Sequence, residues 1–234
     1  MIDHRPLYAL PAANLGWLKA RHHFPVDGRP DPAHMPVKSL YVWNDDEFAA
    51  GHGFPLHHHQ DVEIITYVRS GVVTHEDTLG NSYEINAGDV QVMSTGSGLR
   101  HSEYNRAAAP LKIFQIWLSP NQLGGKPAYA TRRFPGYERA NHLIVLASGL
   151  PQDIESQALP LRADARLLAG RLRTGRKLTY EVSAGHDLYL VPATGQVSIN
   201  GVLANEGDGV AVTKEAAVEV RALQDTELVV IELA

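Results

Sequence analysis

The sequence contains no cysteine among its 234 residues. This absence excludes disulfides, thiolate metal ligands and cysteine nucleophiles, and it is compatible with a reducing compartment. The chain also lacks any apolar run near the ~18 residues that a membrane-spanning helix requires. Its first residues show neither the basic start nor the following apolar stretch of a signal peptide. We therefore expect a cytoplasmic protein that does not associate with a membrane.

An excess of positive charge is missing as well. The chain has 21 Lys and Arg against 26 Asp and Glu, a formal net charge of −5. Proteins that bind nucleic acids depend on clustered Lys and Arg to neutralise phosphates. The composition therefore predicts no direct nucleic-acid partner, whereas protein partners stay open.

Helical periodicity is scarce in this sequence. Short apolar or alternating runs are bounded by Gly and Asn turns, which is typical of strands in a sandwich or barrel. We predict an all-β fold with few short helices, and expect those helices at Ala163–Leu172 and, for one turn, at Asp45–Ala50. The strand-like runs cover residues 39–43, 62–68, 90–93, 111–118, 142–146, 187–191, 196–199, 210–212 and 228–233.

A weak internal repeat divides the chain. Gly71 opens a pattern of apolar residues, a turn and a Gly-Asp pair, and Gly195 opens a similar one. The stretch Ser119–Arg139, which contains Pro, Gly-Gly and Arg-Arg, is expected to be a linker. We therefore predict two domains, residues 1–125 and residues 126–234.

Histidines concentrate in the first half, where six of the twelve lie between positions 52 and 101. Side chains two apart on a strand share one face and lie roughly 6.5 Å apart along it. His57 and His59 would then converge on one point, with His58 on the opposite face. His101 and Glu103 repeat this spacing further along the chain. Two such strands would supply three imidazoles and a carboxylate, a set that suits a first-row divalent metal. The alternative is that these histidines are surface or core residues without a ligand.

Three segments carry a resemblance to a known family. Residues 53–63 (GFPLHHHQDVE), 75–81 (HEDTLGN) and 88–103 (GDVQVMSTGSGLRHSE) resemble the signatures of pirins, a bicupin subgroup of the cupin superfamily. The similarity extends from about Trp17 to the C-terminus and is strongest over residues 44–117. It implies two tandem cupin jelly-roll barrels, with the metal-binding cupin domain first. Alignment of Gly71 with Gly195 places Glu181 and Ser183 at the positions of His57 and His59, so we expect no metal ligands in the second domain.

The resemblance also implies a site and an activity. It assigns one metal ion to four ligands, His57, His59, His101 and Glu103. The ion is expected to be Fe(II), with Ni, Zn, Cu, Mn and Co as alternatives. The implied activity is that of quercetin 2,3-dioxygenase, which opens the central ring of a flavonol with O2 and releases carbon monoxide. The implied partners are therefore a flavonol-like aromatic molecule and O2.

Several further residues receive expected roles. Glu103 or Glu76 would accept the proton of the flavonol hydroxyl, although the segment around Glu76 precedes a turn and is more typical of a solvated loop. Glu63 is expected to orient an imidazole or to pack. His58 replaces a proline that is usual in the family. The barrel lining is expected to comprise Phe54, Val62, Ile64, Met93 and Phe114. His22, His23 and His52 are expected to be structural.

Two other functions stay open at this point. Eukaryotic pirins resemble transcriptional co-regulators, so a metal-binding, redox-sensitive regulatory protein that acts through protein partners is one alternative. Another dioxygenase or isomerase reaction in the same pocket is the second, because a cupin fold does not determine a reaction. Since ligand histidines must be neutral, metal loading is expected to fall below roughly pH 6 to 6.5.

Overall fold

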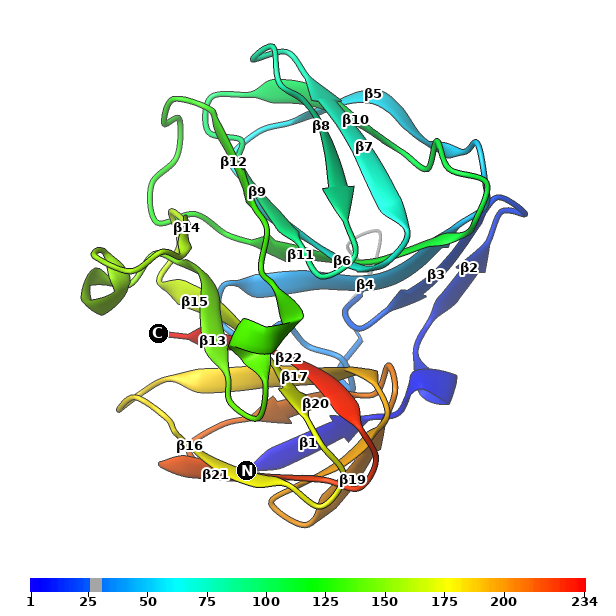
Figure 1. The fold of residues 1–234 in the computed structure, drawn as a ribbon. Helices are drawn as coiled ribbons and strands as arrows, with labels where there is room; N and C mark the ends of the chain where they lie inside the picture. The colour runs from blue at the N-terminus through cyan, green and yellow to red at the C-terminus, as the bar shows by residue number, and fades with distance from the viewer. Residues whose placement is uncertain (26–30) are drawn as a thin grey trace. The chain divides into compact units, whose positions relative to one another are not determined.

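The computed structural model describes residues 1–25 and 31–234, and strands dominate it (Figure 1). The helical segments of the described residues are single 3-10 turns: η1 (Leu7–Ala9), η2 (Gly136–Arg139) and η3 (Pro151–Asp153). The all-β prediction is confirmed. Among the described residues, no helix has the length and apolar character to cross a membrane.

The chain forms two compact units. The first unit comprises Pro11–Phe134 and Leu159–Ala163, and the second comprises Met1–Leu10, Pro135–Ala158 and Asp164–Ala234. The expected boundary at 125/126 thus falls inside the first unit, because the following strand β12 still pairs with β9 there. The amino-terminal strand β1 pairs instead with β20 of the second unit, a non-local pairing that no local pattern indicates.

Two antiparallel sheets build the first unit. The larger sheet has the strand order β12-β9-β6-β11-β4-β3-β2, and the smaller has the order β5-β10-β7-β8. The strands are β2 (Ala12–Asn14), β3 (Leu18–His22), β4 (Leu40–Phe48), β5 (Gly53–His59), β6 (Glu63–Ser70), β7 (Val72–Asp77), β8 (Ser82–Asn86), β9 (Val90–Ser94), β10 (Leu99–Tyr104), β11 (Leu111–Leu118) and β12 (Ala128–Arg132), with the short β14 (Leu159–Pro160) in the later segment.

The second unit repeats this plan. Six of its strands follow the order β1-β20-β17-β22-β15-β13, and four follow β16-β21-β18-β19. The strands are β1 (Ile2–Arg5), β13 (Ile144–Ser148), β15 (Ala165–Leu172), β16 (Lys177–Glu181), β17 (Asp187–Thr194), β18 (Gln196–Ile199), β19 (Val202–Asn205), β20 (Gly209–Val212), β21 (Ala217–Ala222) and β22 (Thr226–Leu233). Gly71 (φ 84°) joins β6 to β7, and Gly195 (φ 76°) joins β17 to β18. The two glycines of the sequence repeat therefore occupy the same turn in each unit, where the positive φ favours glycine.

Both helices expected from the sequence are wrong. Residues 165–172 form β15, which pairs with β13 on one side and β22 on the other. A strand buried on both sides shows a nearly continuous apolar run rather than alternation, and such a run is easily taken for a helix. Asp45 and the residues after it continue β4 as far as Phe48, between β3 and β11.

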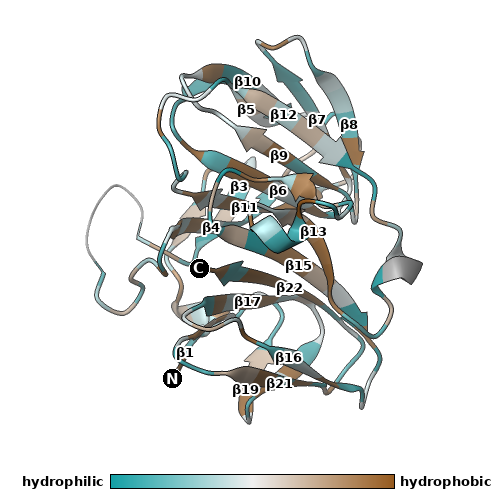
Figure 2. Ribbon diagram, turned by 90° about the vertical axis from the view of Figure 1, so that its left-hand side faces the viewer, coloured by the Kyte–Doolittle hydropathy of each residue, from teal (hydrophilic) through white to brown (hydrophobic). Residues whose placement is uncertain are grey.

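Hydrophobic residues alternate with polar ones along many strands (Figure 2), and the apolar faces bury the core of each unit. In the second unit the buried cluster is wholly aliphatic and includes Leu190, Val197, Val218 and Val220. In the first unit, apolar clusters lie around Phe48 and Ile113 and around Ile64 and Met93. Polar side chains such as Glu103, Gln91 and Thr66 are also buried in this unit.

Candidate metal centre

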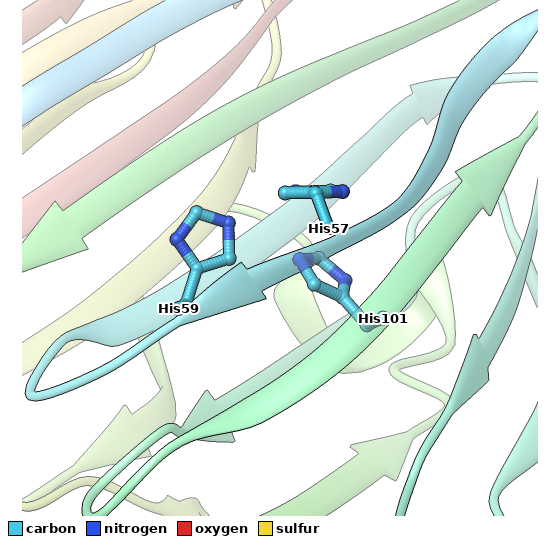
Figure 3. A group of neighbouring side chains, drawn as sticks. All are labelled: His57, His59 and His101. Carbon is cyan, nitrogen blue, oxygen red and sulfur yellow. The ribbon is translucent and has the colours of Figure 1, made fainter.

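Two neighbouring strands of the small sheet carry the histidine cluster. His57 and His59 lie on the same face of β5, and His101 lies directly opposite His57 on β10. Their rings point toward one another (Figure 3). The ring centroids are 4.7 Å apart for His57 and His59 and 4.4 Å apart for His57 and His101, and one nitrogen of each ring lies within 4.8 Å of the others. The predicted convergence of the three imidazoles is therefore a feature of the structure.

A β-bulge sets which side chains enter the cavity next to the cluster. Between His101 and Glu103 the register on β5 moves from His57 to Phe54, so β5 has one extra residue there. Pro55 lies in this irregular segment, where its missing N–H costs no regular ladder bond. As a result Phe54 faces the same side as His57, and both line one cavity.

Glu103 is buried beside the imidazoles, with 1% of its surface exposed. Thr66 Oγ1 donates to its Oε1 at 3.0 Å, and the side-chain amides of Gln91 and Gln115 also donate to the carboxylate. Burial raises the pKa of Glu103 to about 7, although these three hydrogen bonds oppose the shift. A carboxyl group with this pKa exchanges its proton near neutral pH.

The pKa values of two of the clustered imidazoles are lowered. Burial, followed by the neighbouring His57 and His58, lowers the pKa of His59 to about 4. Burial and the adjacent imidazoles push the pKa of His101 further below its ordinary value. Among the described residues, neither ring nitrogen of His101 has a hydrogen-bond partner. Three converging imidazoles, one of them with unpaired buried nitrogens, are a donor set that fits a divalent cation.

The cluster opens into a cavity of about 280 Å³. Trp117 forms part of the wall, and its ring meets that of His59 edge-on at a centroid distance of 4.9 Å. Asp46 is 2% exposed, and within the described part of the chain its Oδ1 has no hydrogen-bond partner. Burial, then the charges of Asp45 and Glu103, raises the pKa of Asp46 to about 8. The cavity is lined by Asn44, Asp46, Phe54, His57, His59, Ile64, His101, Glu103, Gln115 and Trp117.

His75 also belongs to this region, and the sequence did not indicate it. Its side chain is fully buried, and one ring nitrogen lies within 4.8 Å of a nitrogen of His101 and an oxygen of Glu103. Burial lowers the pKa of His75. Burial opposes ionisation of the adjacent Asp77, but hydrogen bonds from Asn81, His75 and Leu79 hold the pKa of Asp77 below its ordinary value. The alternation of the HED segment on a strand was the signal that could have placed His75 and Asp77 inside.

The structure does not bring Glu76 to the cavity. It lies between the inward-facing His75 and Asp77 on β7, so its side chain takes the opposite face, where it pairs with Arg106 at 2.9 Å. Its side chain is 46% exposed. His58 likewise takes the outer face of β5 and is exposed, next to Gly98.

Of the residues expected to line the barrel, some face the cavity and others face the opposite side of their strand. Phe54 and Ile64 line the cavity, and Val62 and Met93 pack together with Ile64. Phe114 was expected in the lining, but it packs against Trp43 and Tyr67, on the face opposite to that of Gln115. Glu63 accepts hydrogen bonds from Ser94 Oγ and the Arg162 N–H. The three histidines that were expected to be structural contact neighbouring groups: His22 contacts Asn44, His23 lies against Trp43, and His52 contacts the Ala50 carbonyl.

Two family models match separate parts of the chain. Residues 5–118 match the Pirin family model, and residues 145–233 match the model of a quercetinase C-terminal cupin domain. Crystal structures of YhhW from Escherichia coli superpose with TM-scores of 0.94 and, for its complex with nickel(II), 0.92. Both are 35% identical in sequence, and the match covers 100% of this chain and 98% and 99% of theirs.

Two sequence relatives cover nearly the whole chain. A pirin-like protein of Caulobacter vibrioides is 48% identical over 234 residues, with all of both chains covered. The quercetin 2,3-dioxygenase of E. coli K12 is 36% identical over 222 residues, which is 94% of each chain. The protein consists of two cupin domains built of antiparallel strands, and one of them contains a histidine cluster. It is therefore a bicupin. Within that class, the chain belongs to the pirin family, and the predicted resemblance is confirmed.

Proposed function

We propose that this protein is a metal-dependent dioxygenase that opens the central ring of a flavonol with O2 and releases carbon monoxide. The observation that carries the proposal is the convergence of three imidazoles on an aromatic-walled cavity that also contains a buried carboxyl group. The name of the E. coli relative and the nickel(II) complex of YhhW support it.

The proposed ligands are His57, His59, His101 and Glu103. A divalent ion held by these residues, for which we propose Fe(II), would act as a Lewis acid toward a hydroxyl and carbonyl pair and would lower the pKa of that hydroxyl. Proton transfer and substrate binding are proposed to depend on the side chains described next.

Glu103 is the proposed proton acceptor. The amides of Gln91 and Gln115 and the hydroxyl of Thr66 hold its carboxyl group in place. The carboxylate of Glu103 would accept the hydroxyl proton as a general base. Glu76 faces away from the cavity, so the proposal gives this role to Glu103 alone.

The cavity walls support a flat substrate with several hydroxyl groups. Phe54 and Trp117 present aromatic surface, whereas Asn44, Asp46 and Gln115 present polar groups to the same space. The unpaired Oδ1 of Asp46 would otherwise be a costly buried polar atom. A phenolic hydroxyl of the substrate would supply its hydrogen-bond partner.

Two adjacent histidines offer a matched test. We expect His59→Ala to lose nickel(II) and Fe(II) binding and to lower flavonol turnover by at least about 100-fold, since even outer partners of metal ligands contribute 10- to 100-fold. His58→Ala is expected to retain both, because His58 is exposed on the other face of the same strand. Turnover is followed by the loss of the quercetin absorption band and by carbon monoxide release under O2.

The outcomes separate the activity from metal binding. Full turnover by metal-depleted His59→Ala would reject the proposed function. Tight metal binding by the wild-type protein, without turnover of any flavonol, would reject the reaction while retaining the metal site. A metal-binding regulatory role would then be the better account.

A further inference from the structure

His75 and Asp77 form a second row of polar side chains next to the proposed ligands. On the small sheet β7 pairs with β10, where Asp77 lies opposite His101 and His75 lies opposite Glu103. Residues two apart on a strand share a face, so this row faces the same side as the ligands. The proposed reaction gives neither residue a role.

The ring of His75 is held in one orientation. It is fully buried and stacks on Tyr129 at a centroid distance of 4.4 Å and an interplanar angle of 17°. Its Nε2 lies 3.1 Å from Oδ2 of Asp77. Because an ionised carboxylate only accepts hydrogen bonds, Nε2 carries the hydrogen and Nδ1 has a free lone pair. Within the described residues, that Nδ1 has no hydrogen-bond partner.

Asp77 is itself anchored by the turn that follows β7. Its Oδ1 accepts from the backbone N–H groups of Leu79 and Asn81 at 2.9 and 3.0 Å. Its Oδ2 accepts from the Asn81 side-chain amide at 2.9 Å. These donors leave the carboxylate little freedom to turn away from His75. The segment HEDTLGN, residues 75–81, thus builds a rigid acceptor for the imidazole.

His101 requires such a partner if it binds a metal ion. A ligating imidazole uses one nitrogen for the ion, and its other nitrogen keeps a hydrogen that is donated to a nearby acceptor. Both nitrogens of His101 are buried without a partner in the described part of the chain. The carboxylate of Glu103 is already bound by three donors. Nδ1 of His75 is an acceptor that lacks a donor among the described residues. It makes no hydrogen bond to His101 in this structure, and the two rings lie 5.6 Å apart.

We propose that Asp77 and His75 are positioning residues that hold His101 toward the metal ion through a hydrogen-bonded relay. In this relay Asp77 accepts from Nε2 of His75, and Nδ1 of His75 accepts the remaining N–H of His101. The relay rests on the proposed metal site, and it is independent of the reaction catalysed there. It explains why a buried histidine and aspartate follow one another at i, i+2 on a strand beside the ligands.

Nickel(II) titration of three variants tests the relay. We expect His75→Leu to bind nickel(II) about 10- to 100-fold more weakly, the usual effect of removing an outer partner of a ligand. His75→Gln is expected to restore most of the affinity, because its amide donates to Asp77 while its carbonyl accepts from His101. Val73→Ala removes buried apolar volume from the same strand, and it controls for a general loss of packing.

The results distinguish this relay from the metal site itself. Equal nickel(II) affinity of His75→Leu and the wild type, or equal losses in the Leu and Gln variants, would overturn the relay alone. No nickel(II) binding by the wild type would overturn the metal site and the relay with it. An affinity loss in Val73→Ala as large as that in His75→Leu would also count against the relay.

A second measurement uses the wild-type protein, so it does not depend on the folding of a variant. Nitrogen-15 NMR of histidine-labelled, zinc(II)-loaded protein reports which nitrogen of His75 is protonated. The relay predicts the Nε2–H form with Nδ1 as a hydrogen-bonded acceptor. Protonation at Nδ1, or an Nδ1 that accepts no hydrogen bond, would contradict it.

Discussion

Two carboxyl groups stand out at the scale of single residues. Burial raises the pKa of Glu103 to about 7 and, with the charges of Asp45 and Glu103, that of Asp46 to about 8. Ionising either group therefore costs free energy in the folded protein that it does not cost in the unfolded chain. A stabilising salt bridge has the opposite effect, because it makes ionisation of the carboxyl group favourable in the folded state. Raised carboxyl pKa values are typical of residues in functional sites.

The stability of Glu103→Gln should accordingly depend on pH. The ordinary glutamate pKa is 4.5, and burial raises that of Glu103 to about 7 in the folded state. The ionisation cost is thus absent below pH 4.5, grows between the two values and is complete above about pH 7, where it reaches about 3 kcal/mol. The free energy of unfolding of the variant relative to the wild type should rise over this interval.

Urea unfolding with a chelator present, at pH values from 4.5 to 8, measures this difference. The substituted amide also changes the hydrogen bonds with Gln91 and Gln115. That effect adds a constant to the difference in free energy of unfolding and does not change how the difference depends on pH. A difference that stays constant with pH would show that Glu103 titrates normally.

At the scale of elements, the edge strand β5 decides the geometry of the site. It pairs only with β10 in the described sheet, and it carries two of the three clustered imidazoles. Gly53 allows the first residues of β5 to lie close to β10. A Cβ there would overlap the carbonyl oxygen of Glu103 and would lie 2.5 Å from Cα of Tyr104.

Gly53→Ala should therefore displace β5 from β10. We expect the free energy of unfolding to fall by about 1–3 kcal/mol, as for other overpacked sites, and nickel(II) affinity to fall with it. Denaturant unfolding and a nickel(II) titration measure the two effects. Leu56→Ala, an exposed position on the same strand, is the control. Wild-type affinity in Gly53→Ala would show that the cluster does not depend on this close approach.

At the scale of the whole molecule, two units of similar topology differ in their interiors. Aliphatic residues fill the buried cluster of the second unit. The groups of side chains that could hold a metal ion among the described residues, His57–His59–His101 and His75–His101–Glu103, both belong to the first unit. At the places of His57 and His59 in the repeat, the second unit has Glu181, at the end of β16, and Ser183. Among the described residues, two units of the same plan thus differ in whether they contain a group of potential metal ligands.

A bound metal ion should stabilise the protein through the first unit only. With nickel(II) at 100 times its dissociation constant, the folded state gains about 2.7 kcal/mol, and the melting temperature should rise. His57→Ala is expected to abolish the rise, whereas Glu181→Ala, at the matching place in the second unit, should keep it. Differential scanning calorimetry with and without nickel(II) measures the shift. An unchanged shift in His57→Ala would place the ion elsewhere.

The spacing of residues along the chain was sufficient to predict part of the candidate site. The i, i+2 spacing of His57 with His59 and of His101 with Glu103 predicts shared faces on two strands, and the structure shows those faces meeting. Phe114 and Glu76 were misplaced, because one residue of shift along a strand moves a side chain to the other face. His75 and Asp46 were missed, because their importance comes from burial beside residues far away in the sequence.

The sequence alone determined the all-β class, the two-fold repeat and the donor types of the site, since these depend on composition, local periodicity and signature segments. Tertiary structure alone decided that residues 165–172 are a strand, that β1 joins the second unit and that burial raises the pKa values of Glu103 and Asp46. Strand pairing and desolvation are non-local effects, so no window of neighbouring residues contains them.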